Sequence, residues 1–130
     1  MKRLLNRIHA ITADAYIMTN YTGFYDDGQQ HCIEYPCLSI TCDTWNQYNR
    51  IFDLLRRSRN FRILYSNTTN KYFRVVSNDD FIRIKQQEAK AEMFLNAFWQ
   101  YIHDNPQQDS RTQQNNAIDA GRKAIANLSY

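Results

Sequence analysis

The sequence predicts an α+β fold with a single antiparallel sheet built from two hairpins, with helices packed on one face and a long C-terminal helix. Segments rich in β-branched and aromatic residues alternate with segments whose apolar residues recur at helical spacing. Only three Gly and two Pro occur in 130 residues, which leaves few tight turns and disfavours a many-stranded sandwich or barrel. The length is close to the commonest size of one domain.

The chain is expected to begin with a short amphipathic helix over residues 3–12, because its leucines and isoleucines recur at helical spacing. A run of β-favouring residues from Ala15 to Tyr25 then predicts a strand. Asp26-Asp27-Gly28-Gln29 predicts the turn of a hairpin, since Asp and Gly tolerate the backbone angles of a tight reversal.

A second strand is expected from about His31 to Cys42. Pro36 interrupts it and marks an edge or a bulge, because proline cannot donate a ladder hydrogen bond. Leu38 and Ile40 alternate with the polar residue Ser39, so we expect one face of this strand to be buried.

Asp43 or Thr44 is the expected cap of the next helix. Its apolar residues fall on one stripe, formed by Trp45, Tyr48, Ile51, Phe52 and Leu55. Residues 61–66 and 71–76 then predict a second hairpin around a polar Asn-Thr-Thr-Asn turn.

Ser77-Asn78-Asp79-Asp80 predicts the start of the long helix, with polar caps and two acidic residues to meet the helix dipole. The helix is expected to reach about His103 and to stop before Pro106. Apolar and basic residues alternate over residues 81–85, however, and a third strand there is the alternative.

Residues 1–106 are therefore expected to form a single α+β domain, and residues 107–130 a polar Gln/Asn-rich linker with a short C-terminal helix. That last helix is expected over residues 117–128 and is weakened by Gly121. The predicted core consists of Ile8, Leu38, Ile40, Trp45, Ile51, Phe52, Leu55, Ile63, Val75, Phe94, Phe98 and Tyr101.

The sequence predicts a cytoplasmic location and no membrane contact. No apolar run approaches the roughly 18 residues of a membrane span, and no signal-peptide pattern opens the chain. The three cysteines are odd in number, which argues against a disulfide framework and fits a reducing compartment.

Charge is unevenly distributed along the chain, although the net charge is only +3. Residues 10–49 contain five acidic residues and no Lys or Arg, whereas residues 50–74 contain seven basic residues against Asp53. Basic residues interleaved with tyrosines suit either a phosphate backbone or an acidic protein surface. The predicted binding residues are Arg50, Arg56, Arg57, Arg59, Arg62, Tyr65, Lys71, Tyr72 and Arg74.

No catalytic residue, metal site or cofactor is predicted. His31, Cys32, Cys37 and Cys42 are spread along one predicted strand, whereas zinc ligands usually come in close pairs on a turn. A cysteine nucleophile or a cation site at the early acidic residues is the less favoured reading. The three glycines do not lie at the spacing of a phosphate-binding loop.

Two functions remain open. The favoured hypothesis is a small non-catalytic binding protein that occludes a protein or nucleoprotein partner with an acidic surface, of the type that phages or mobile elements encode as inhibitors. The alternative is a nucleic-acid-binding protein that uses the Arg/Tyr-rich surface of residues 50–74. An enzyme is the least favoured class.

Overall fold

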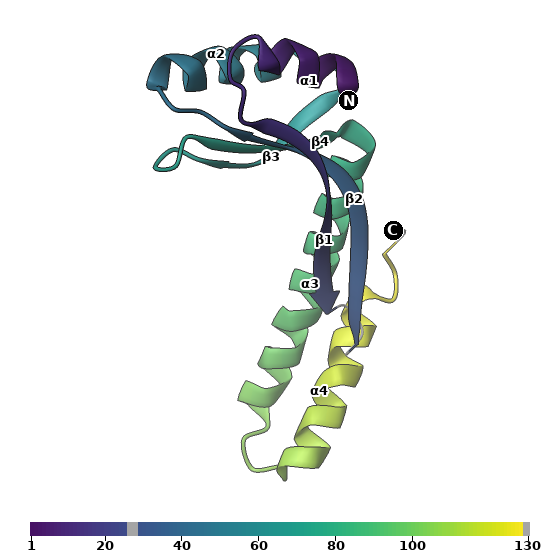
Figure 1. Ribbon diagram of the computed structural model, residues 1–130. Coiled ribbons are helices and arrows are strands. Elements are labelled where there is room, and N and C mark those ends of the chain that lie inside the picture. The colour runs from purple at the N-terminus through teal and green to yellow at the C-terminus, as the bar shows by residue number, and fades with distance from the viewer. Residues whose placement is uncertain (26–28, 129–130) are drawn as a thin grey trace. The chain divides into compact units, whose positions relative to one another are not determined.

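The computed structural model describes residues 1–25 and 29–128 (Figure 1). In chain order its elements are α1 (Lys2–His9), β1 (Ala15–Tyr25), β2 (Gln30–Thr41), α2 (Trp45–Arg56), β3 (Phe61–Asn67), β4 (Tyr72–Ser77), α3 (Asn78–Asp104) and α4 (Ser110–Ile125). One four-stranded antiparallel sheet and a long late helix confirm the predicted α+β class. The turn expected at Asp26-Asp27-Gly28 lies outside the described residues.

The chain divides into two compact units, one formed by residues 1–21 with 34–82 and the other by residues 22–33 with 83–130. The first unit contains α1, α2, β3 and β4, and the second contains most of α3 and all of α4. The predicted domain of residues 1–106 would have to fold on its own, and its boundary at residue 106 stays a prediction.

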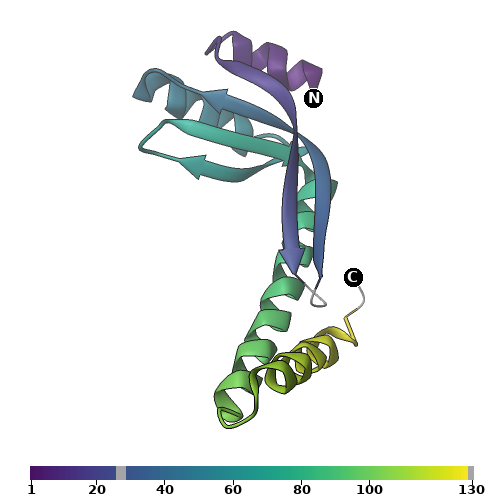
Figure 2. The same cartoon turned by 60° about the horizontal axis from the view of Figure 1, so that its bottom comes forward.

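The strands are ordered β1-β2-β4-β3, so β2 and β4 are central while β1 and β3 form the edges (Figure 2). Leu38 and Ile63 both lie opposite Val75, which aligns the three strands β2, β4 and β3. Strand β2 continues through Pro36, which lies beyond the stretch from Leu38 to Thr41 that is paired with β4. The missing proline N–H is therefore not needed by that ladder.

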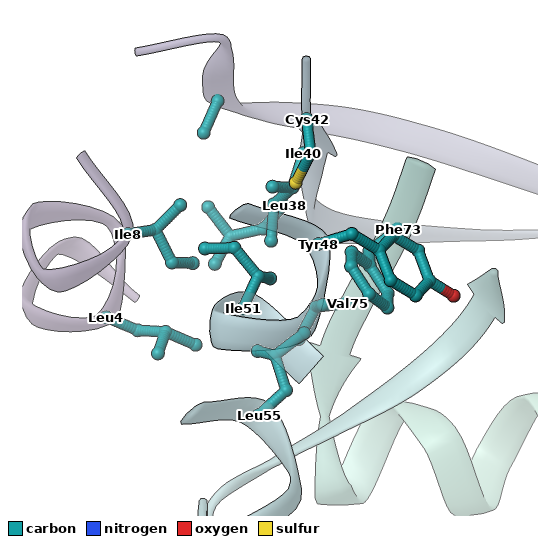
Figure 3. Packing of buried hydrophobic residues seen from close by; sticks show 11 residues of the cluster. Leu4, Ile8, Leu38, Ile40, Cys42, Tyr48, Ile51, Leu55, Phe73 and Val75 are labelled. Atoms are coloured by element: carbon teal, nitrogen blue, oxygen red, sulfur yellow. The ribbon is translucent and has the colours of Figure 1, made fainter. Parts of the chain in front are cut away.

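One face of the sheet packs against α1 and α2 (Figure 3). Strands β2 and β4 supply Leu38, Ile40, Phe73 and Val75, Cys42 follows directly after β2, and the helices supply Leu4, Ile8, Tyr48, Ile51 and Leu55. The rings of Tyr48 and Phe73 stack with their centroids 4.5 Å apart. Burial of these apolar side chains confirms most of the predicted core and supplies the main driving force for this unit.

The prediction that Trp45 and Phe52 belong to the core is wrong, because their side chains are 52% and 46% exposed. Helix α2 buries Tyr48, Ile51 and Leu55, and the two exposed rings lie seven residues apart on the flank of that buried stripe. The prediction that one face of β2 is buried is incomplete, because Ser39 on the opposite face is buried as well. In the second unit Phe94 is buried, whereas Phe98 and Tyr101 are half-buried.

Thr44 is the N-cap of α2 and forms a capping box with Gln47. The Gln47 N–H donates to Thr44 Oγ1 at 3.2 Å, and the Thr44 N–H donates to Gln47 Oε1 at 3.3 Å. The Gln47 side-chain amide also donates to the Ile11 carbonyl at 3.2 Å. These bonds satisfy backbone groups that a helix start leaves unpaired and join α2 to the segment that follows α1.

Helix α3 begins at Asn78 and spans 27 residues, so residues 81–85 are helical and the alternative strand is excluded. Helix α4 begins at Ser110, seven residues before the predicted start, and the linker is correspondingly short. Asp109 explains the earlier start, because its carboxylate accepts from the Thr112 N–H at 3.0 Å and caps the helix.

Gly121 has a packing role that the sequence did not predict. A Cβ at this position would lie 2.6 Å from ring atoms of Phe94, so the glycine permits the close approach of α4 to α3.

We expect Gly121→Ala to destabilise the protein by about 1–3 kcal/mol, because the buried Phe94 ring would have to move. Helix propensity alone predicts the opposite sign, a gain of up to about 1 kcal/mol. Urea unfolding followed by circular dichroism measures the difference. Gly23→Ala is the matched control, since its new Cβ would meet only the flexible end of Gln30. Stabilisation by Gly121→Ala would contradict the packing role.

Candidate functional site

The nine predicted binding residues all belong to the first unit, but they divide between two surfaces. Four arginines lie on or just after α2, the helix that covers the core side of the sheet: Arg50, Arg56, Arg57 and Arg59. The remaining five lie on or beside the β3–β4 hairpin: Arg62, Tyr65, Lys71, Tyr72 and Arg74. The sequence could not separate these groups, because strand alternation assigns faces only once the pairing is known.

Tyr72 and Arg74 point away from the core covered by α1 and α2. Their neighbours Phe73 and Val75 point into that core, and successive strand residues point to opposite faces. Residues directly opposite them share their face, and we call this surface the polar face of the sheet. It is formed by Ser39, Thr41, Tyr65, Asn67, Tyr72 and Arg74, and by the next pair along the strands, Arg62 and the buried Val76.

Arg74 lies at the centre of the polar face, with Ser39 opposite it on β2 and Tyr65 opposite it on β3. Its guanidinium carbon lies 5.8 Å from the centroid of the Tyr72 ring, within range of a cation–π contact. Its Nε is buried and has no hydrogen-bond partner among the described residues.

The Arg74 guanidinium keeps its charge. Partial burial acts to lower its pKa, but the hydrogen bond to Tyr72 and the neighbouring Tyr72, Cys37 and Tyr35 side chains outweigh this effect. The pKa is therefore raised above the ordinary value for arginine. A fixed positive charge is thus held beside aromatic rings on a half-buried surface.

The tyrosines around Arg74 are held in place by hydrogen bonds. Ser39 Oγ donates to the Tyr72 hydroxyl at 3.0 Å, and Asn67 Nδ2 donates to the Tyr65 hydroxyl at 3.2 Å. The two rings lie 6.1 Å apart between centroids, and Tyr65 remains 47% exposed. Rigid, partly exposed tyrosines lose little conformational entropy when they contact a partner.

The strand residues that form the polar face include two arginines, Arg62 and Arg74, and no acidic residue. Glu34 is the one acidic residue within the four described strands, and it neighbours Tyr35 in sequence. Glu34 lies outside the stretch from Leu38 to Thr41 that pairs with β4, whereas Ser39 lies opposite Arg74 within it. Arg62, on the same face as Arg74, lies over the Phe81 ring with its guanidinium carbon 5.3 Å from the centroid.

The α2 arginines have a different setting. Arg56 and Arg57 both contact the Asp53 carboxylate, at 2.7 Å and 3.1 Å, and all three side chains are largely exposed. Exposed pairs of this kind contribute at most about 1 kcal/mol each. Asp53 partly offsets the positive charge of this surface.

Lys71 lies in the turn between β3 and β4 and contacts an aromatic residue that the site prediction omitted. Its Nζ is 5.2 Å from the centroid of the Trp45 ring, and its carbonyl accepts from the Cys42 N–H at 2.9 Å. Lys71 has a positive φ of 52°, an uncommon backbone conformation that closes the β3–β4 hairpin. The apolar periodicity of α2 predicted Trp45 in the core. Its position in the first turn of the helix was the one sign in the sequence that its ring could be exposed.

The cysteines lie in different settings. All three are free: Cys32 is exposed, while Cys37 and Cys42 are buried. Burial raises the pKa of both buried thiols; nearby Arg74 partly opposes this at Cys37, and Asp43 adds to it at Cys42. Within the described residues no group of three or more His, Cys, Asp or Glu could hold a metal ion.

The chain matches no protein-family model, no curated protein sequence and no solved structure. In the described part of the chain, no helix is both long and apolar enough to cross a membrane.

A thiol reagent at neutral pH should label one cysteine per native chain, because only Cys32 is exposed and the other two thiols are buried with raised pKa. Mass spectrometry after timed labelling checks the number and position of the adducts. Cys32→Ser should abolish native labelling, and all thiols should react in denaturant. Fast labelling of Cys37 in the native protein would contradict its burial.

Proposed function

We propose that this chain is a small non-catalytic binding protein that occludes an acidic surface of a protein or nucleoprotein partner, and that the polar face of the sheet makes the central contacts. The observation that carries the proposal is Arg74, a half-buried cation whose Nε lacks a hydrogen-bond partner among the described residues and whose neighbours on the paired strands include no acidic residue.

Arg74 favours binding to an anionic partner, because a buried hydrogen-bond donor without an acceptor costs free energy. A carboxylate or phosphate oxygen, reached by a small shift of the side chain, would provide the missing acceptor and a charge-assisted bond. The flanking Tyr65 and Tyr72 provide aromatic area, and Arg and Tyr are the residue types that dominate binding energy at interfaces.

The function needs no chemistry at the site. Steric occlusion requires only a folded surface that binds tightly, which suits a small cytoplasmic inhibitor of the type that phages or mobile elements encode. The buried thiols support a non-catalytic role, because a raised pKa leaves little nucleophilic thiolate at neutral pH.

Nucleic-acid binding is the second candidate, and the tilted pair of Tyr65 and Tyr72 beside Arg62 and Arg74 is the observation that favours it. Bases of a single strand could stack on exposed tyrosine rings while the arginines contact phosphates. Its charge count is small, however, since the polar face contributes two arginines to such a contact.

The double substitution Arg62→Ala with Tyr65→Ala should weaken capture of the partner at least tenfold, because it removes a cation and an aromatic contact. The assay is quantitative pull-down by the tagged chain from a lysate of cells that carry it. The matched control is Arg56→Glu with Arg57→Glu, which alters α2 and should leave capture within about threefold. Melting temperatures of both variants should stay close to that of the native chain. Loss of capture in the α2 variant alone would move the site to that helix.

Salt separates the two candidate functions. Under the proposed function, a random single-stranded oligonucleotide should bind weakly and dissociate by physiological salt, because few phosphate contacts are available. Fluorescence anisotropy over a salt series measures this. Tight binding that survives salt and falls on Tyr65→Ala would instead support the nucleic-acid alternative, since stacking contributes about 1–3 kcal/mol per base.

A further inference from the structure

We propose that the polar face binds one carboxylate side chain of its partner, an aspartate or a glutamate, through hydrogen-bond donors supplied by the hydroxyls of Tyr65 and Tyr72 and the guanidinium of Arg74. Such a site rests on the binding function proposed above, and it names the chemical group that the central contacts recognise.

The hydrogen bonds around Tyr65 leave its hydroxyl as a donor. The Asn70 N–H donates to Asn67 Oδ1 at 3.1 Å, which fixes the orientation of the Asn67 side-chain amide. Its Nδ2 therefore donates to the Tyr65 oxygen, at 3.2 Å. Because that oxygen accepts from Asn67, its own hydrogen must point elsewhere. Tyr65 is 47% exposed, so the hydrogen is within reach of a partner.

The Tyr72 hydroxyl is in the same state. Its oxygen accepts from Ser39 Oγ at 3.0 Å and also from the Arg74 guanidinium, which has donors and no acceptor. A hydroxyl oxygen has two lone pairs, so both are used and the Tyr72 hydrogen is left to donate. Ser39 is buried, and its bond to Tyr72 holds this hydroxyl in position.

The donors come from neighbouring positions of the paired strands β3 and β4. Arg74 lies opposite Tyr65 in the ladder, and its guanidinium carbon is 5.8 Å from the centroid of the Tyr72 ring. The two tyrosine rings lie 6.1 Å apart between centroids. An ionised carboxylate has acceptors only, so it matches such a group of donors. A neutral amide or hydroxyl would bring donors of its own and would not compensate the charge of Arg74.

Charge favours a carboxylate over a phosphate. Arg74 supplies one positive charge at the centre of the polar face, while Arg62 lies over the Phe81 ring. An ionised carboxylate carries one negative charge, whereas a phosphorylated side chain carries about −1.5 to −2 at pH 7 and is recognised by arginine clusters. A nucleic-acid strand repeats its charge along the backbone and calls for a track of cations. The tyrosine hydroxyls add hydrogen bonds without adding charge, so one carboxylate balances the site.

Small anions test the site without the partner. In chains with isotope-labelled tyrosine and arginine side chains, acetate at constant ionic strength should shift the NMR signals of Tyr65, Tyr72 and Arg74 until they saturate. Acetamide has the same size and no charge, and it should shift none of them. Dimethyl phosphate represents the nucleic-acid backbone and should bind at least about threefold more weakly than acetate, because the site has few cations. Equal shifts with acetamide, or tighter binding of dimethyl phosphate, would overturn the carboxylate assignment.

Removal of the hydroxyls separates the donors from the rings. Tyr65→Phe with Tyr72→Phe keeps both rings and the charge of Arg74, and should weaken acetate binding about tenfold, because both lost bonds go to a charged group. Tyr16→Phe, at an exposed tyrosine of β1, is the matched control and should leave the affinity unchanged. If the double variant melts early, Tyr65→Phe alone serves, since its hydroxyl is exposed, and should weaken acetate binding about threefold. Native affinity in a folded variant would refute the role of the hydroxyls.

The carboxylate site and the occlusion function fail in different experiments. Partner capture by a folded Tyr65→Phe with Tyr72→Phe chain at native affinity, together with absence of acetate binding by the native chain, would refute the site and leave occlusion standing. Acetate binding by a native chain that captures no partner would support the site and refute occlusion.

Discussion

The structure depends on burial of strand β2 on both of its faces. Leu38 and Ile40 point into the core beneath α1 and α2, while Cys37 and Ser39 are buried on the opposite side. A one-residue slip of β2 would exchange these sets and place a hydroxyl in the apolar core. The register against β4 is therefore strongly specified, and through β4 it fixes the position of Arg74 between Ser39 and Tyr65.

Local patterns in the sequence predicted most of the elements, because helix caps and turns act over a few residues. Thr44 and the stripe of α2 are examples, and so is the hairpin of β3 and β4. Properties set by tertiary contacts were missed. Periodicity could not tell that Trp45 lies beyond the edge of the buried stripe, and Gly121 was read as a weakness rather than as space for Phe94. The sequence predicted which residues belong to the candidate site, but not that they divide between α2 and the polar face of the sheet.

Arg74 shows how a small sheet can hold a charge near its interior without an acidic partner. Its positive charge is met by the Tyr72 ring and hydroxyl rather than by a carboxylate. A neutral partner of this kind orients the guanidinium without cancelling its field. An arginine in an ion pair, such as Arg56 with Asp53, would first have to exchange that partner for a new one.

The hydrogen bond from Gln47 to the Ile11 carbonyl has a consequence for the order of folding. Residues 45–77 form α2, β3 and β4 through contacts that are close in sequence, and such contacts form early. Helix α1 has eight residues and is too short to persist alone, so it depends on docking across a separation of 36 residues. We therefore expect α1 to order last and to open first, with amide hydrogens that exchange by local opening well below the free energy of global unfolding.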